Sequence, residues 1–218
     1  GIPGQNMEDF SQDLEESLAH DPNHLSLYGL EIHPGTHFFH DQQIREMQSE
    51  RSELERELYL QALHKTASMS LIQYEVSNFA KADFQSRSNL KVWDGQPYLG
   101  LGCGAHSFDG VNRWGNVRSM RKYMESVGRE EPPRDFMETP TRLQQASERL
   151  MLSLRRPEGL NILSWQEEFQ IGLSLKQKNQ MEKLKDQDLI SWESPILKLT
   201  TEGMLLADAI TAELMPEA

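Results

Sequence analysis

The sequence is poor in cysteine and in long apolar runs. Its 218 residues include one cysteine, Cys103. A single cysteine excludes an intrachain disulfide. It also cannot hold an iron–sulfur cluster by itself, because such a cluster usually takes several thiolates. No apolar run approaches the roughly 20 residues that cross a bilayer, and no signal-peptide pattern is present. We therefore expect a cytoplasmic protein without a membrane span.

Positive charge is also scarce. The chain carries 22 Lys and Arg against 34 Asp and Glu, a formal net charge of -12. Sequence-independent binding of nucleic acid needs clustered cations that displace counterions from phosphates, so this class of function is disfavoured. With 37% hydrophobic residues, the chain can bury a core without disulfides or metal. One large domain or two modest ones fit the length.

Alternating patterns in the first part of the chain indicate an α/β fold. A helix, a strand, a second helix and a second strand follow one another, which favours parallel strands joined by crossover helices. A third short strand and a further helix come next. The expected helices cover 6–19, 42–65 and 117–127, and the expected strands cover 25–32, 71–76 and 98–101.

A different pattern follows the segment 130–140, which is rich in proline and acid and is the best candidate for a domain boundary. Three helices, a short hairpin and a last helix are expected, and this is winged-helix order. We therefore predict one domain over 1–129 and a second over 141–218. The expected elements are helices at 141–154, 164–169, 174–186 and 201–214, and hairpin strands at 189–192 and 196–199.

The segment from Tyr74 to Phe108 holds the densest set of candidate functional residues. It combines a strand that ends in polar residues, an aromatic loop and the glycine-rich turn 99–106. That turn lacks the strand, helix and later acid that frame a dinucleotide site, so we expect its glycines to allow positive φ or close backbone approach. We expect Cys103 to be a small buried residue and His106 to be a hydrogen-bonded structural residue, with a reactive thiol and a site role as the alternatives.

This segment resembles the central block of the HemW-type haem chaperones, which are radical S-adenosylmethionine (SAM) proteins related to oxygen-independent coproporphyrinogen III oxidase. It reads YEVSNFAKADFQSRSNLKVWDGQPYLGLGCGAHSF, where the family usually has YEISNFAKPG, Arg-His-Asn-x-x-Tyr-Trp and YLGLGxGAHS. The start, GIPGQ, resembles an interior family segment, and the last hairpin and helix resemble the family's C-terminal domain. The resemblance implies the second half of a partial (β/α) radical SAM barrel, followed by a small winged-helix-like domain. Because Cys-x-x-x-Cys-x-x-Cys is absent, we expect a fragment of a longer protein.

The resemblance also implies SAM and a [4Fe–4S] cluster as cofactors of the full-length parent. Gln5 matches a glutamine placed toward the SAM ribose, and an amide can both donate to and accept from hydroxyls. Phe79 and Ala80 match a strand end that passes the adenosine, mostly through backbone atoms. Without the family, these residues fit a Pro-Gly turn and the polar end of a strand. We assign no catalytic residue and no metal ligand, and whether the parent is an enzyme is left open.

The haem-associated motif of the family is altered in this chain. Arg87 and Asn89 match it, but Ser88 stands where the family has His and Val92 where it has Tyr. A serine hydroxyl is a poor axial ligand for haem iron, so the obvious donor is lost. Arg87 can meet a haem propionate or pair with a surface acid, and we favour the surface pair.

Three histidines offer a second source of ligands. His33, His37 and His40 lie within eight residues, and a loop that folds them inward would form a metal or haem site. The alternative, which we favour, is a solvent-exposed loop that is merely rich in histidine.

Three classes of function follow. The first is a haem chaperone-like radical SAM protein, with haem and a haem-accepting protein as partners and a homodimer left open. The second is a diverged interaction module of the same fold that does not bind haem, or a coproporphyrinogen III dehydrogenase-type oxidoreductase in the full-length parent. The third, a winged-helix nucleic-acid binder, has little support beyond four lysines near the expected recognition helix. These are Lys176, Lys178, Lys183 and Lys185.

Overall fold

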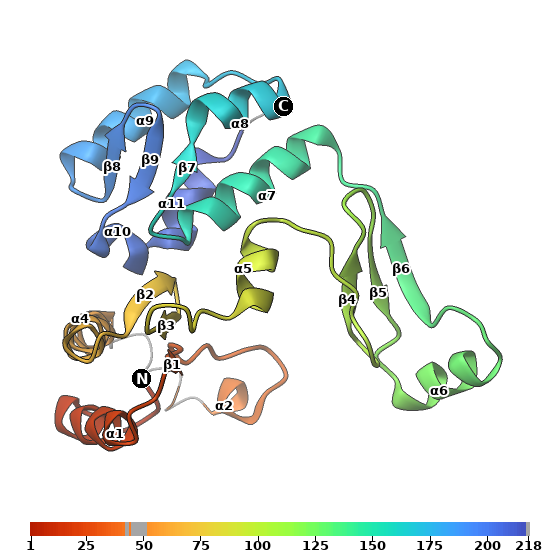
Figure 1. Cartoon of the computed structure of the whole chain (residues 1–218), viewed down its shortest axis with the longest axis horizontal. Helices are drawn as coiled ribbons and strands as arrows, with labels where there is room; N and C mark the ends of the chain where they lie inside the picture. The colour runs from red at the N-terminus through yellow and green to blue at the C-terminus, as the bar shows by residue number, and fades with distance from the viewer. Residues whose placement is uncertain (42–43, 45–51, 217–218) are drawn as a thin grey trace. The chain divides into compact units, whose positions relative to one another are not determined.

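The computed structural model describes residues 1–41, 44 and 52–216, and it divides the chain into two compact units, Gly1–Gln85 and Ser86–Ala218. Figure 1 shows the elements of both units. The domain boundary predicted at 130–140 does not coincide with the boundary between these two units, which lies after Gln85, and it stays a prediction. Among the described residues, no helix is long and apolar enough to cross a membrane.

The first unit packs two long helices and a small sheet around one apolar core. Asn6 begins the first helix, because its side chain accepts from the backbone of Asp9 and completes a capping box. The core consists of Leu14, Leu18, Ala62, Leu71 and Phe79. The elements are α1 (Met7–Ala19), β1 (His24–Ser26), α2 (His37–His40), α4 (Ser52–Ser68), β2 (Ile72–Glu75) and β3 (Asn78–Ala80).

The sheet of the first unit has the order β1-β3-β2, and both outer strands pair antiparallel with β3. β1 and β2 therefore run in the same direction, but they do not pair with each other, because β3 lies between them. The parallel pairing expected from the sequence is not found among the described strands, which all pair antiparallel. The expected strand at 25–32 is shortened to β1, and Tyr28 in the following segment is 72% exposed. The sequence predicted a buried strand over this run, whereas the described strand ends at Ser26, and Leu27 adds one backbone hydrogen bond to the Ser77 carbonyl. Residues 42–43 and 45–51, where the helix expected over 42–65 would begin, lie outside the described residues.

The second unit begins with a short helix and an antiparallel sheet. The sheet has the order β4-β5-β6, with α6 inserted between β5 and β6. The segment 130–140, the predicted domain boundary, contains the strand β6, which pairs with β5. The expected strand at 98–101 is reduced to a single bridge, from Tyr98 to Phe108. The elements are α5 (Arg87–Trp93), β4 (His106–Phe108), β5 (Arg113–Asn116), α6 (Met120–Gly128) and β6 (Arg134–Glu138).

The rest of the second unit has the predicted order of three helices, a hairpin and a closing helical segment. A short strand, β7, joins the hairpin to give the order β7-β9-β8, and the closing segment is divided at Leu206. Trp165 is buried and donates from Nε1 to the carbonyl oxygen of Ala146, which ties α8 to α7. The elements are α7 (Arg142–Leu154), β7 (Leu160–Asn161), α8 (Ile162–Phe169), α9 (Leu175–Asp186), β8 (Ile190–Glu193), β9 (Ile196–Leu199), α10 (Thr201–Leu205) and α11 (Ala207–Leu214).

Candidate functional site

The altered haem-associated motif forms the helix α5, where the sequence had suggested a loop. Ser86 begins this helix, because its hydroxyl accepts from the backbone nitrogen of Asn89. Ser88 and Val92 are four residues apart, so they lie on the same face of α5. Both side chains are exposed, as is Arg87. The positions where the resembled motif carries His and Tyr are therefore neighbours on an accessible helical surface.

The C-terminal end of α5 is tied to α7 and to the residues that follow it. The carbonyl oxygen of Asp94 accepts from Arg149 Nη1 at 2.8 Å, and its carboxylate pairs with Arg156. Gly95, at φ +65°, lies so close that an added Cβ would be 3.3 Å from Arg149 Nη2. A guanidinium at this end of a helix satisfies a free carbonyl and the negative end of the dipole. These contacts fix the orientation of α5.

Two adjacent cavities lie along α7, and we call them together the α7 groove. The first has a volume of about 140 Å³ and the second about 130 Å³. Each is smaller than the roughly 300–1,000 Å³ of typical ligand pockets. The first is lined by Val92, Gly95, Gln96, Tyr98, Phe108, Arg113, Glu148, Met151 and Leu152. The second is lined by Gly95, Phe108, Gly110, Pro140, Gln145, Glu148, Arg149, Leu152, Glu168 and Phe169.

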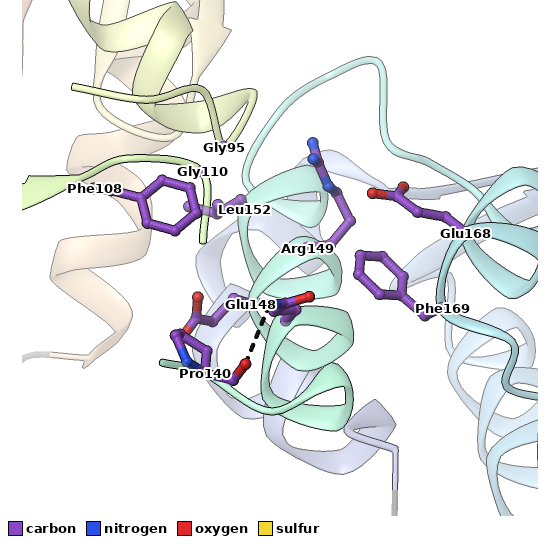
Figure 2. A pocket seen from close by; sticks show the side chains of 10 residues that line it. Gly95, Phe108, Gly110, Pro140, Glu148, Arg149, Leu152, Glu168 and Phe169 are labelled. Atoms are coloured by element: carbon purple, nitrogen blue, oxygen red, sulfur yellow. Dashed lines mark hydrogen bonds between the residues drawn. The ribbon is translucent and has the colours of Figure 1, made fainter. Parts of the chain in front are cut away.

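Figure 2 shows the second cavity, with Phe108 beside Leu152 of α7, and with Glu168 and Phe169 reaching in from α8. The groove is bordered by an ion-pair network around Arg113. Arg113 Nη2 lies 2.7 Å from Glu138 and 3.0 Å from Glu148. The hydrogen bond to Glu138 raises the pKa of Arg113 above its usual value, and Glu148 adds to this, while partial burial opposes it.

Sequence reasoning missed α7 as part of a site. Its buried stripe consists of Ala146, Leu150 and Leu154, at helical spacing. Met151 and Leu152 lie outside this stripe. These additional apolar residues are the feature of the sequence that could have indicated a second apolar face on the helix.

The glycine-rich turn is held by side chains, and the prediction for its glycines is confirmed. A Cβ on Gly100 would lie 2.1 Å from the carbonyl oxygen of His106, and Gly102 has φ +101°. The backbone nitrogen of Gly102 donates to Tyr123 Oη at 3.1 Å, and its carbonyl accepts from Asn116 Nδ2 at 2.9 Å. The turn is therefore a fixed structural element.

The two side chains singled out in that turn differ from expectation. Cys103 is half-buried, where a buried residue was expected. His106 is exposed, and its ring contacts Phe136 with centroids 5.5 Å apart, so its side chain lies on the surface. Pairing within the β4–β5–β6 sheet places it there, because neighbouring residues of a strand face opposite sides.

The candidate SAM residues lie in the first unit. Gln5 Nε2 donates to Asp13 Oδ2 at 3.1 Å. Phe79 and Ala80 lie side by side on β3, the middle strand, and their side chains are almost fully buried. Their side chains therefore belong to the core, and only backbone atoms could face a ligand.

A buried polar network ends the β2–β3 hairpin. Glu75 is 1% exposed and accepts from Asn78 Nδ2, whose amide oxygen in turn accepts from the Ser26 hydroxyl. Gln73 Nε2 donates to Tyr59 Oη at 2.7 Å, and burial raises the pKa of the Tyr59 phenol. The polar residues that the sequence places at the end of β2 therefore form a buried network and do not face the solvent.

The three histidines after β1 do not form a site in the described residues. His33, His37 and His40 are all exposed. His33 Nε2 lies 3.5 Å from Glu31. Within the described part of the chain, no group of three or more His, Cys, Asp or Glu side chains could hold a metal ion. The three side chains are exposed, as favoured from the sequence, but His37 and His40 lie in the helix α2 and not in a loop.

No family model matches the chain, but several known proteins are similar to it in sequence. The heme chaperone HemW of Bacillus subtilis (strain 168) is 30% identical over 218 residues, covering 100% of this chain and 57% of the relative. HemW of Lactococcus lactis is 25% identical over 96% of this chain and 55% of the relative. The mouse mitochondrial radical S-adenosyl methionine domain-containing protein 1 is 29% identical over 100% of this chain and 52% of the relative. The chain thus spans about half the length of these relatives.

A solved structure shares the fold. The coproporphyrinogen III oxidase HemN of Escherichia coli, a radical SAM enzyme, matches 99% of this chain and 53% of its own with a TM-score of 0.74 at 15% identity. The α/β fold predicted from the resemblance is therefore confirmed. Over the part of those proteins that it spans, the chain is similar in sequence to the heme chaperone HemW and to the radical S-adenosyl methionine domain-containing protein 1.

Proposed function

We propose that this chain performs the role of the matching part of a HemW-type haem chaperone, which binds haem and passes it to an accepting protein. The similarity to the Bacillus subtilis heme chaperone HemW over all 218 residues carries this proposal. A cytoplasmic location is part of the same proposal.

The residues on α5 do not fit ligation of haem iron. Ser88 offers only a hydroxyl, and iron in haem proteins is usually held by imidazole, thiolate, thioether or phenolate donors. Arg87 is exposed and offers its guanidinium to a propionate. We therefore expect this chain to bind haem weakly through α5, without an axial ligand from that helix.

SAM and a [4Fe–4S] cluster belong to the proposal for the longer protein. The single thiol of Cys103 does not make a cluster site, so cluster ligands would come from residues outside these 218. The Gln5 amide, which now donates to Asp13, is our candidate for the SAM ribose. Phe79 and Ala80 would contribute backbone contacts only, since their side chains fill the core.

A haem titration tests the proposal. The Soret band would be recorded with the unmodified chain and with the double variant Ser88→His and Val92→Tyr. An axial imidazole that contributes about 1.4 kcal/mol raises haem affinity about tenfold. Lys122→His, on the exposed surface of α6, is the control for a non-specific imidazole, and it should leave the affinity unchanged. Equal affinity in all three proteins would mean that α5 is not the haem site.

A second candidate is an interaction module that no longer handles haem. The observation that favours it is the loss of the iron donor at Ser88 together with the open cavity beside Val92. A flat titration in the unmodified chain, with haem binding only in the double variant, would support this candidate. The oxidase reading needs a cluster to cleave SAM, so this chain alone does not support it.

A further inference from the structure

The second unit, which carries the altered motif, contains a single histidine, His106, out of 7 in the chain. Its side chain on β4 is exposed. Among the described residues its ring contacts Phe136, and neither ring nitrogen has a hydrogen bond or an ion pair. A neutral imidazole nitrogen is a common ligand of transition metals and of haem iron. His106 therefore offers this unit the kind of donor that Ser88 lacks.

The imidazole is held by an aromatic ring that reaches it across a glycine. His106 of β4 pairs with Gly115 of β5, and Gly115 pairs with Phe136 of β6, so the three residues face the same side of the sheet. A Cβ on Gly115 would lie 2.4 Å from Phe136 Cε1, which places the Phe136 ring over this glycine. The ring centroids of His106 and Phe136 are 5.5 Å apart, with an interplanar angle of 62°. This edge-on contact limits the orientation of the imidazole.

The side of the sheet that carries His106 also borders the cavity beside α5. Phe108 is two residues beyond His106 on β4, so both side chains face the same way. Phe108 lines this cavity together with Val92 and Tyr98. Tyr98 is 36% exposed and Phe136 is 41% exposed. Aromatic surface on this side of the sheet is therefore accessible to a large flat ligand such as the macrocycle of haem.

Arg118 is available to an anionic group near His106. Its side chain is exposed, and within the described part of the chain it has no ion pair or hydrogen bond. The side chain lies beside the glycine-rich turn, since a Cβ on Gly104 would be 3.9 Å from Arg118 Cγ. A guanidinium binds a carboxylate, such as a haem propionate, through two parallel hydrogen bonds.

The other charged groups near His106 do not select a ligand. Arg113, on the side of the sheet that carries His106, is already paired with Glu138 and Glu148. Asp135 is an exposed acid next to Phe136 in the sequence, and it would repel a propionate. The imidazole and the aromatic rings therefore favour haem, and we expect a propionate at Arg118 and not at Asp135.

We propose that His106 is the axial ligand of haem iron in this chain. Phe136 is a positioning residue for the imidazole, and Arg118 binds a propionate. This inference rests on the proposed function, because haem is the ligand named for the Bacillus subtilis relative. It deepens that function by assigning the iron donor that α5 does not supply.

A haem titration of the 218-residue chain and of His106→Ala tests the proposal. Loss of an axial imidazole worth about 1.4 kcal/mol should lower haem affinity about tenfold and shift the Soret band. Free imidazole in the solution should restore the Soret band of the unmodified chain. The matched control is His64→Ala, at an exposed histidine of α4, which should change neither quantity. Unchanged affinity and an unchanged Soret band in His106→Ala would overturn the proposal.

Iron-free protoporphyrin IX separates iron ligation from packing. It carries the same ring and propionates, so its affinity, measured by fluorescence, should be equal for His106→Ala and the unmodified chain. Arg118→Gln should weaken the binding of haem and of protoporphyrin IX about threefold each. Circular dichroism reports whether each variant is folded. An equal loss of both ligands in His106→Ala would give the imidazole a packing role and overturn the proposal.

Variants of β6 test the positioning role of Phe136. Phe136→Ala should weaken haem binding about fivefold and move the Soret band toward that of His106→Ala. Phe136→Tyr keeps the ring and should restore both. Met137→Ala is the control, because Met137 is an exposed neighbour that faces the other side of the sheet. A Soret band unchanged in Phe136→Ala would remove Phe136 from the proposal.

Cys103→Ser tests the alternative donor of the same turn. If the Soret band shifts in Cys103→Ser and not in His106→Ala, the iron is held by the thiolate and the proposal for His106 is wrong. Haem binding that does not depend on His106 would leave the proposed function standing and overturn this inference alone. A titration in which the unmodified chain binds no haem would overturn both, so the two failures are distinguishable.

Discussion

Arg149 of α7 donates a hydrogen bond from Nη1 to the carbonyl oxygen of Asp94 at a distance of 2.8 Å. The two residues are 55 positions apart in the sequence, and their contact joins the end of α5 to α7. The contact also fixes the position of the altered motif, because the motif forms α5 and this helix ends at Asp94. The first prediction concerns this bond.

Arg149→Ala should lower the free energy of unfolding by about 1.5–3 kcal/mol, because a half-buried carbonyl loses a charged donor. Urea unfolding followed by circular dichroism measures the change. The control is Arg142→Ala on the same helix, which removes an exposed contact with Gln170 and should cost less than about 0.5 kcal/mol. An equal loss of unfolding free energy in the two variants would show that the Arg149–Asp94 hydrogen bond contributes no more to stability than an exposed contact does.

Gly100→Ala should destabilise the glycine-rich turn. The added Cβ would lie 2.1 Å from the carbonyl oxygen of His106, a backbone atom that cannot move independently of β4. Overpacking of this kind costs about 1–3 kcal/mol. Gly128→Ala, where nothing lies within 4 Å of the new Cβ, should be neutral or stabilising. Thermal melting of both variants compares them, and a stable Gly100→Ala protein would contradict the predicted clash.

Phe79→Ala should act through stability and not through a cofactor site. Phe79 is 1% exposed in the core of the first unit, and removal of such a ring costs about 3–5 kcal/mol. Gln5→Ala, at a half-buried side chain bound to Asp13, should cost less than about 1.5 kcal/mol. Denaturant unfolding measures both, and Gln5→Ala is therefore the variant suited to a test of SAM binding. A small loss for Phe79→Ala would contradict its place in the core.

Alkaline pH should weaken the first unit through Tyr59. Burial raises the pKa of this phenol in the folded chain, so the folded state keeps the proton longer than the unfolded state. Stability is then fully present below about pH 10, the unfolded pKa, and is lost as the pH rises from there toward the folded pKa. The free energy of unfolding, measured from pH 9 to pH 11, should fall less steeply in Tyr59→Phe.

The matched control for Tyr59→Phe is Tyr28→Phe, because Tyr28 is 72% exposed. Its slope with pH should equal that of the unmodified chain. If Tyr59→Phe also keeps the unmodified slope, burial of the Tyr59 phenol does not determine the alkaline loss.

Helices with strong periodicity and caps could be predicted from the sequence. Thr141 and Ser174 each precede a helix, and each forms a capping box with the glutamine three residues later, Gln144 and Gln177. The hairpin around Ser194 and Pro195 was also placed correctly. These features depend on neighbours along the chain, and so a local pattern is enough to find them.

The antiparallel sheet β4-β5-β6 could not be predicted in the same way. β6 is exposed along its whole length and lies in the segment 130–140, where the sequence predicted a domain boundary and no strand. It is a strand because β5, about 20 residues earlier, presents a partner: Trp114 pairs with Met137 and Gly115 with Phe136. Pairing between distant residues supplies hydrogen bonds that no local propensity indicates.

Some features of the candidate site could likewise be predicted from the sequence, and others could not. The sequence by itself determined the family resemblance and the chemical fact that Ser88 and Val92 lack the donors found at these positions in the resembled motif. Only the tertiary structure decided that α5 is held by Arg149 and Arg156, and that Val92 faces a cavity shared with α7. The physical reason is that the chemistry of a side chain depends only on the residue at that position. A cavity and its charges, in contrast, arise when packing brings together side chains that are far apart in the sequence.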